Sequence, residues 1–186
     1  GYFSADFHNH ATMYLMAQIF ERHDKEQFDI YAYSYGPDKQ DEMRKRLIEN
    51  VDVFHDVREM SDMQIVEQAR SEQLDIAIDL KGFTKGARLA PFAHGLASVQ
   101  ISYLGYPGTI GADFIDYIVA DPVVIPEDKQ HHYSEQIIYL PNTYQPTDNT
   151  RVISDKIITR EDMGLPSKGF VFCCFNNNYK ISPKEF

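Results

Sequence analysis

The sequence predicts an α/β fold, a Rossmann-like doubly wound parallel sheet, on three observations. Strand-like and helix-like segments alternate over steps of about 30 residues, the size of a βαβ unit. Two apolar segments, residues 74–80 and 99–104, each lead into a glycine-rich loop. Glycine lets a backbone approach a ligand closely, and parallel sheets bind ligands at the carboxyl ends of their strands. We therefore expect a pocket at that edge, although ordinary turns between strands and helices also explain the glycines.

The composition is that of a soluble globular protein with no nucleic-acid or membrane partner. With 186 residues, 43% of them apolar, the chain is long enough for one α/β domain and a remainder. A net charge of −10 argues against DNA or RNA, whose binding depends on clustered lysine and arginine. No apolar run approaches the roughly 18 residues of a membrane span and no signal-peptide pattern opens the chain, so we expect a cytoplasmic protein.

No metal site is predicted. Cys173 and Cys174 are adjacent within an apolar run, so their side chains should point to opposite faces and indicate neither a disulfide framework nor a metal site. His131 and His132 have no third ligand at a characteristic spacing, which favours an exposed pair in a loop over a pair of metal ligands.

The first elements are a strand, a polar loop and a helix. Residues 1–4 match the end of a strand whose beginning we expect to precede this chain, and residues 6–10 form the loop. Asn9 or Thr12 is the expected helix cap. Apolar residues at helical spacing then lay one stripe along the helix, namely Met13, Met16, Ala17 and Phe20.

Further strands and helices follow in alternation. The sequence from Ser61 to Gln64 has the pattern of a capping box and opens a helix with Ile65, Val66 and Ala69 turned inward. Two other helices are expected at 41–50 and 87–94. Runs rich in β-branched and aromatic residues predict strands at 28–34, 51–54, 74–80, 99–104, 117–120 and 136–140.

The chain is expected to contain one domain and the start of a second. Prolines become frequent after Asp121, which indicates a boundary between Asn142 and Asp155. We expect a first domain at 1–150, and a linker with the first strand of a second domain at 151–186.

The tail has the pattern of a new fold. An apolar run at 170–175 predicts a buried strand near the start of the second domain at Gly169, and residues 182–185 have the pattern of a helix start. A helix that stops after so few residues cannot bury an apolar face, so we expect this chain to be a fragment of a longer protein.

Lys180 is a candidate anion-binding residue. It follows the predicted strand and precedes the predicted helix, where free backbone N–H groups and the helix dipole favour a phosphate. A solvated surface lysine is the simpler interpretation of its position alone.

Asp6 and His10 are candidates for proton transfer. They lie in a loop after the first strand, so they should share the sheet edge with the glycine-rich loops. The carboxylate could orient the imidazole ring and raise its basicity. A histidine that caps the following helix explains the residue equally well.

In combination, these features resemble one family. The segments GYFSADFHNHAT, GFTKGAR, ISYLGYPGTIGADFIDY, YSEQIIYLPNTYQP and FNNNYKISP occur in the order found in the catalytic region of the O-GlcNAc transferase and SPINDLY glycosyltransferases. The resemblance covers almost the whole chain, and the elements LGYPGT and FNxxYKI are specific to the family. The form SADFxNHxT is closer to the O-GlcNAc branch than to the plant O-fucosylating branch.

The resemblance implies a two-domain GT-B fold with a nucleotide-sugar between its halves. This chain would be the N-terminal, acceptor-side half plus the start of the nucleotide-sugar-binding half. The implied activity is inverting and metal-independent transfer of GlcNAc from UDP-GlcNAc to Ser or Thr of proteins, without a further cofactor. Tetratricopeptide repeats that select the protein or peptide acceptor are expected in the full-length chain. We expect this chain alone to be inactive.

The resemblance also assigns residues. Lys180 would face the donor diphosphate and stabilise the leaving UDP, and Asn177 stands beside the nucleotide where the family usually has Gln. His10, a candidate base in the family, would border the donor sugar and the acceptor hydroxyl, with Asp6 nearby. Four residues would wall the sugar pocket: Thr12, Leu104, Gly105 and Pro107.

Two alternatives stay open at this point. One is a related transferase with another donor or acceptor, such as GDP-fucose, UDP-glucose or an Asn acceptor. The other is a noncatalytic interaction domain that kept the fold, against which the presence of Lys180 and His10 argues. A stand-alone nucleotide-binding protein is a weaker fourth interpretation.

Overall fold

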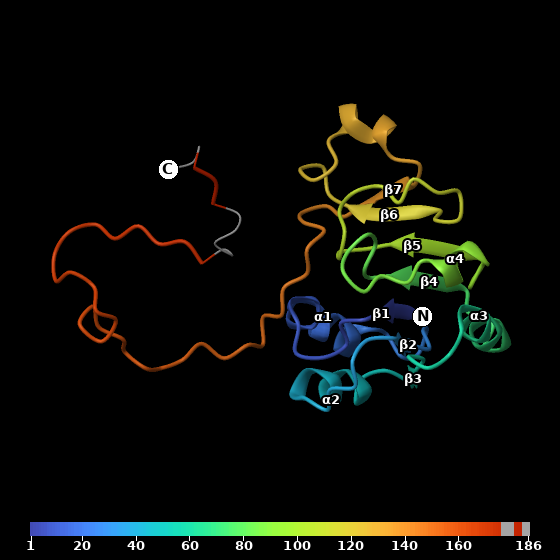
Figure 1. The fold of residues 1–186 in the computed structure, drawn as a ribbon, viewed down its shortest axis with the longest axis horizontal. Helices are drawn as coiled ribbons and strands as arrows, with labels where there is room; N and C mark the ends of the chain where they lie inside the picture. Colours follow the sequence, from blue (N-terminus) through green and yellow to red (C-terminus); the bar gives the residue numbers. More distant parts are fainter. Residues whose placement is uncertain (176–180, 184–186) are drawn as a thin grey trace. The chain divides into compact units, whose positions relative to one another are not determined.

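The computed structural model describes residues 1–175 and 181–183. The chain divides into two compact units, Gly1–Thr150 and Arg151–Phe186. The first unit contains all the regular secondary structure of the described residues (Figure 1). None of the helices in this described part has the length and apolar character that crossing a membrane requires.

The first unit is built on one seven-stranded sheet in which every pairing is parallel. The strands lie in the order β3-β2-β1-β4-β5-β6-β7, which is the order of a doubly wound Rossmann-like sheet with one more strand at the end. The predicted fold class is therefore confirmed. The elements are β1 (Tyr2–Ser4), α1 (Ala11–Arg22), β2 (Tyr31–Ser34), α2 (Glu42–Ile48), β3 (Val53–Asp56), α3 (Asp62–Ser71), β4 (Ile76–Asp79), α4 (Ala90–Ala93), β5 (Val99–Ser102), β6 (Tyr117–Ala120), the short 3-10 helix Glu127–His132, and β7 (Gln136–Tyr139).

Helices cover both faces of the sheet because successive strand residues point to opposite sides. In β1, Tyr2 packs with α1 and α2, in a cluster that includes the fully buried Phe20. The next residue, Phe3, packs on the other face with α3 and α4, in a cluster that includes the buried Phe92. Phe3 also stacks on Tyr33 of β2, with ring centroids 4.3 Å apart. The central strand is thus held from both sides.

Helix starts follow local chemistry. The capping box at Ser61 is present as predicted, since its hydroxyl accepts from the Gln64 N–H and the Gln64 side chain accepts from the Ser61 N–H. The predicted cap of α1 was wrong: neither Asn9 nor Thr12 caps it, because the His10 side chain accepts from the Thr12 N–H. The helix expected at 87–94 is reduced to the single turn of α4.

The second unit departs from the prediction. Its described residues form turns, bends and irregular segments without a helix or a strand. The buried strand expected at 170–175 is not formed, and all its residues except the half-buried Val171 are exposed, with Phe172 at 90% and Phe175 at 97%. A strand needs a neighbour that pairs with its backbone, and no other described residue of this unit supplies one. Cys173 and Cys174 are free and exposed.

Candidate functional site

The site lies where the strand order reverses, between β1 and β4. The strands β2 and β3 continue on one side of β1, and β5, β6 and β7 continue on the other side of β4. Phe3 of β1 is in register with Asp79 of β4, so the loops that follow the two strands leave the same edge of the sheet side by side. This edge is the place where doubly wound sheets bind ligands.

A buried ion pair joins these two loops. The Nζ atom of Lys81, in the loop after β4, lies 2.6 Å from Oδ2 of Asp6, in the loop after β1. Lys81 is 4% exposed and Asp6 is 8% exposed. Lys81 is not among the site residues predicted from the sequence. The two residues come together because β1 pairs with β4, and this pairing cannot be read from the local sequence pattern.

The backbone next to Lys81 is fixed by Asp79, the last residue of β4. The Asp79 carboxylate accepts from the backbone N–H of Lys81 at 3.0 Å and from that of Gly82 at 2.7 Å. Burial raises the pKa of Asp79 to about 6, although these two hydrogen bonds and the nearby Lys81 act in the opposite direction. The carboxylate therefore shapes the turn from inside the protein.

His10 caps α1 and lies beside Asp6. Its Nδ1 atom accepts from the Thr12 N–H at 3.2 Å and lies 3.4 Å from Asp6 Oδ2. With Nδ1 as the acceptor, the neutral ring carries its proton on Nε2. Burial lowers the pKa of His10, and the opposing effect of Asp6 is smaller. The capping role considered in the sequence analysis is therefore present, and Nε2–H is the group left to contact a ligand.

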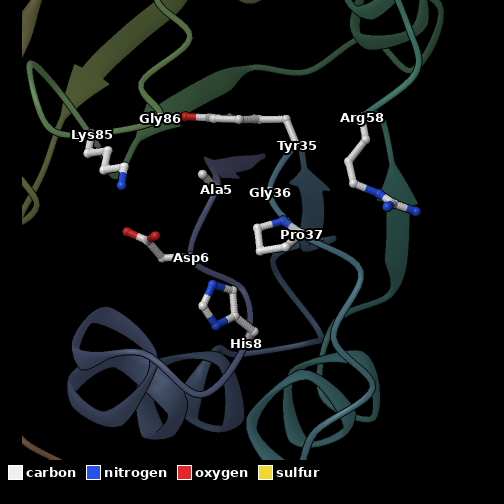
Figure 2. A pocket seen from close by; sticks show the side chains of 9 residues that line it. All are labelled: Ala5, Asp6, His8, Tyr35, Gly36, Pro37, Arg58, Lys85 and Gly86. Atoms are coloured by element: carbon white, nitrogen blue, oxygen red, sulfur yellow. The ribbon is translucent and has the colours of Figure 1, made fainter.

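A cavity of about 470 Å³ opens next to this cluster (Figure 2). Three loops line it, those that follow β1, β2 and β4, and Arg58 adds a side chain from beyond β3. In Figure 2, the Asp6 carboxylate and the Lys85 side chain lie on the same side of the cavity. The lining residues are Ala5, Asp6, His8, Tyr35, Gly36, Pro37, Arg58, Lys85 and Gly86.

The glycine-rich loop after β5 lies against the loop after β4. A Cβ atom on Gly105 would lie 2.1 Å from the carbonyl oxygen of Leu80, so a glycine is required there by the close approach of two backbones. The preceding Leu104 has a φ of 66°, which is unusual for a residue with a branched side chain. Pro107 is exposed, and its carbonyl oxygen accepts from the Tyr133 hydroxyl at 3.1 Å.

The predicted site residues thus divide into three groups. Asp6, His10 and Thr12 lie together, and the Thr12 hydroxyl is 3.5 Å from Asp6 Oδ2. Leu104, Gly105 and Pro107 belong to the loop after β5 and do not line the cavity of Figure 2.

Asn177 and Lys180 lie outside the described residues. Among the residues that are described, no group of three or more His, Cys, Asp or Glu side chains could hold a metal ion.

Comparisons with known proteins match this chain to one family. The profile of glycosyl transferase family 41 matches residues 1–156. One relative is the probable UDP-N-acetylglucosamine peptide N-acetylglucosaminyltransferase SEC of Arabidopsis thaliana, to which this chain is 38% identical over 189 aligned residues. The alignment covers 99% of this chain and 19% of that protein. It is 32% identical to the UDP-N-acetylglucosamine peptide N-acetylglucosaminyltransferase of Caenorhabditis elegans, over 87% of this chain and 14% of that protein. The chain therefore spans about a fifth or less of the length of these relatives.

A solved structure shares the fold. A mutant of the O-GlcNAc transferase of Thermobaculum terrenum superposes with a TM-score of 0.76 and 31% identity, over 78% of this chain and 28% of that one. The match of the family profile extends over most of the chain, and the fold agrees with it. The chain belongs to glycosyl transferase family 41.

Proposed function

We propose that the protein containing this chain is an inverting, metal-independent O-glycosyltransferase that transfers GlcNAc from UDP-GlcNAc to Ser or Thr of proteins. Membership of glycosyl transferase family 41 is the observation that carries this proposal. Relatives named for UDP-N-acetylglucosamine and a peptide acceptor support the donor and the acceptor class. The parallel sheet would form the acceptor-side half of a GT-B fold, and residues 151–186 would lead into the nucleotide-sugar-binding half.

The arrangement at the edge of β1 and β4 suits the chemistry of this transfer. The acceptor oxygen attacks the anomeric carbon, the bond to UDP breaks, and the hydroxyl proton leaves for a base or water. Asp6 supplies a buried carboxylate and His10 an Nε2–H donor beside it, so both would contact the sugar or the acceptor hydroxyl. Lys180 would neutralise the charge that develops on the departing diphosphate.

A second donor is favoured by one residue. Asn177 stands where the resemblance implies Gln beside the nucleotide, so a donor with another base, such as GDP-fucose, is the second candidate. The matched SPINDLY protein of Arabidopsis thaliana, 28% identical over 99% of this chain and 20% of that protein, is itself named for UDP-N-acetylglucosamine, which supports the first donor. Tetratricopeptide repeats elsewhere in the protein and a cytoplasmic location remain predictions.

The experiment is calorimetric titration of UDP, UDP-GlcNAc and GDP-fucose into the native protein that contains this chain, and into its Lys180→Ala variant. We expect UDP and UDP-GlcNAc to bind, with a loss of at least about 1.5 kcal/mol in the variant, the scale of one charge-assisted hydrogen bond. Lys168→Ala is the matched control, because Lys168 is an exposed lysine of the same tail. Preferential binding of GDP-fucose would move the assignment to the second donor. Absence of any nucleotide binding would favour a noncatalytic interaction domain.

A further inference from the structure

We propose that Lys81 is a positioning residue for the transferase reaction, which fixes the orientation of the Asp6 carboxylate at the pocket. This inference rests on the proposed function, because Asp6 is useful to a reaction only if a substrate binds at this edge of the sheet. Lys81 itself is buried and does not line the cavity, so it would act through Asp6 rather than on the substrate.

The two oxygens of Asp6 have different surroundings. Oδ2 receives the Lys81 ammonium at 2.6 Å, and Thr12 Oγ1 and His10 Nδ1 lie at 3.5 Å and 3.4 Å from the same atom. Oδ1 receives no hydrogen bond from any residue that the structure describes. The side chain of Asp6 lines the cavity. Lys81 therefore holds one oxygen and leaves the other as the acceptor for a ligand hydroxyl or water.

The position of the ammonium is itself fixed. The backbone N–H groups of Lys81 and Gly82 are both bound by the Asp79 carboxylate, so the turn that carries the lysine cannot shift freely. The side chain of Lys81 is 5% exposed. A buried ammonium is costly without a partner, and Asp6 is the carboxylate in direct contact with it. The ion pair of Lys81 and Asp6 is therefore a rigid link between the loops after β1 and β4, where the strand order reverses.

Removal of the lysine charge should disturb the reaction more than the binding of the donor. Without the ammonium, the Asp6 carboxylate can rotate about its side-chain bonds, and a misplacement of about 1 Å can cost about 100-fold in rate. We expect Lys81→Met to lower kcat by about 10- to 100-fold and to leave the KM for UDP-GlcNAc within about twofold. Lys81→Arg should restore part of the lost kcat, because it keeps the positive charge.

The test is a double-mutant cycle in the native protein that contains this chain. Single variants Lys81→Met and Asp6→Asn and their combination are compared by kcat and by chemical unfolding. If Lys81 acts through Asp6, the double variant loses no more kcat than Asp6→Asn alone. Lys25→Met, a lysine beyond the end of α1, is the control for removal of a charge and should leave kcat unchanged.

Each outcome decides one question. Additive losses of kcat, or a normal kcat in Lys81→Met, would overturn the positioning role while leaving the transferase assignment in place. If the fall of kcat in Lys81→Met is no larger than its loss of folded protein, the role of Lys81 is structural and the positioning inference is overturned. If the wild-type protein transfers no sugar from any donor, the proposed function fails, and the positioning inference, which depends on that reaction, fails with it. The unfolding cycle would still report whether Lys81 and Asp6 are coupled.

Discussion

The guanidinium of Arg46 joins Asp148, a residue 102 positions later in the chain, to α1 and α2. Nη1 of Arg46 lies 2.6 Å from Oδ2 of Asp148, and the same guanidinium contacts both carboxylate oxygens of Glu21, at 2.5 and 2.9 Å. Arg46 belongs to α2, Glu21 to α1, and the side chain of Asp148 is fully buried. The last residues of the first unit are therefore fastened to two of its helices.

Substitution of Asp148 by Asn should destabilise the first unit. The change removes the charge that Arg46 contacts and weakens a charge-assisted hydrogen bond, so we expect a loss of about 1.5 to 3 kcal/mol in the free energy of unfolding. Urea denaturation of the chain measures it. Asp128→Asn is the matched control, because the Asp128 side chain is 71% exposed, and it should change stability by less than about 0.5 kcal/mol. A loss in Asp148→Asn no greater than that of the control would contradict the prediction.

The same carboxylate predicts a response to acid. Hydrogen bonds from Arg46, and after them those from Thr150, lower the pKa of Asp148 from 3.8 to about 2, against the effect of burial. Because the native pKa lies below the unfolded one, the contribution of Asp148 is complete above about pH 4 and disappears as the pH falls toward 2. The stability difference between wild type and Asp148→Asn should shrink over this interval, as measured by urea denaturation at several pH values. A difference that stays constant would contradict the assignment.

The raised pKa of Asp79 predicts that the free energy of unfolding changes with pH in the opposite direction, at higher pH. Burial raises its pKa from 3.8 to about 6, so the native state holds a proton that the unfolded chain has already released. Stability should therefore fall as the pH rises from about 4 to 6, and the Asp79→Asn variant should lack this fall. Urea denaturation of both proteins at intervals between pH 4 and 7 checks the prediction. A difference between them that grows with pH in favour of wild type would refute it.

Substitution of Gly105 by Ala should destabilise the first unit through a steric clash, which can be told apart from backbone strain. Alanine at this position would place a Cβ atom 2.1 Å from the Leu80 carbonyl oxygen, and so close a contact with backbone should cost about 3 kcal/mol, the upper end of the usual cost of overpacking. Gly111 offers the control in the same loop, because it has a φ of +67° and no atom within 4 Å of an added Cβ. Gly111→Ala should cost about 1 to 2 kcal/mol from strain alone. Thermal unfolding of the two variants compares them, and a smaller loss in Gly105→Ala would rule out the clash.

The sequence could predict features whose causes are local. The capping box at Ser61 depends on residues three positions apart, and the alternation of strands and helices depends on patterns within each segment. The strand expected at 28–34 begins only at Tyr31, because the preceding Ile30 N–H is bound by the distant side chain of Asp52. Such partners are fixed by the fold and are not visible in a local pattern.

In the candidate site, too, residues with a local signal could be predicted and residues placed by the fold could not. Asp6 and His10 could be selected because both follow a strand within one short loop. Lys81 could not be selected, since its meaning depends on the order of the strands, which places it 2.6 Å from Asp6. The prediction of a strand at 170–175 was wrong for a related reason. This apolar run has the composition of a strand, but a strand forms only beside a partner, which composition does not reveal.

The central position of β1 has a consequence for the order in which this unit can fold. β1 pairs with β2 through Tyr2 and Ala32, but its other edge pairs with β4, at Ile78. During synthesis, β1, α1 and β2 can associate early as a βαβ unit, while one edge of β1 stays unpaired until the chain has been made as far as β4. Unpaired edges of this kind recruit other chains, and long-range parallel pairing is slow. Between the appearance of β2 and that of β4 on the ribosome, this unit is therefore open to misassembly.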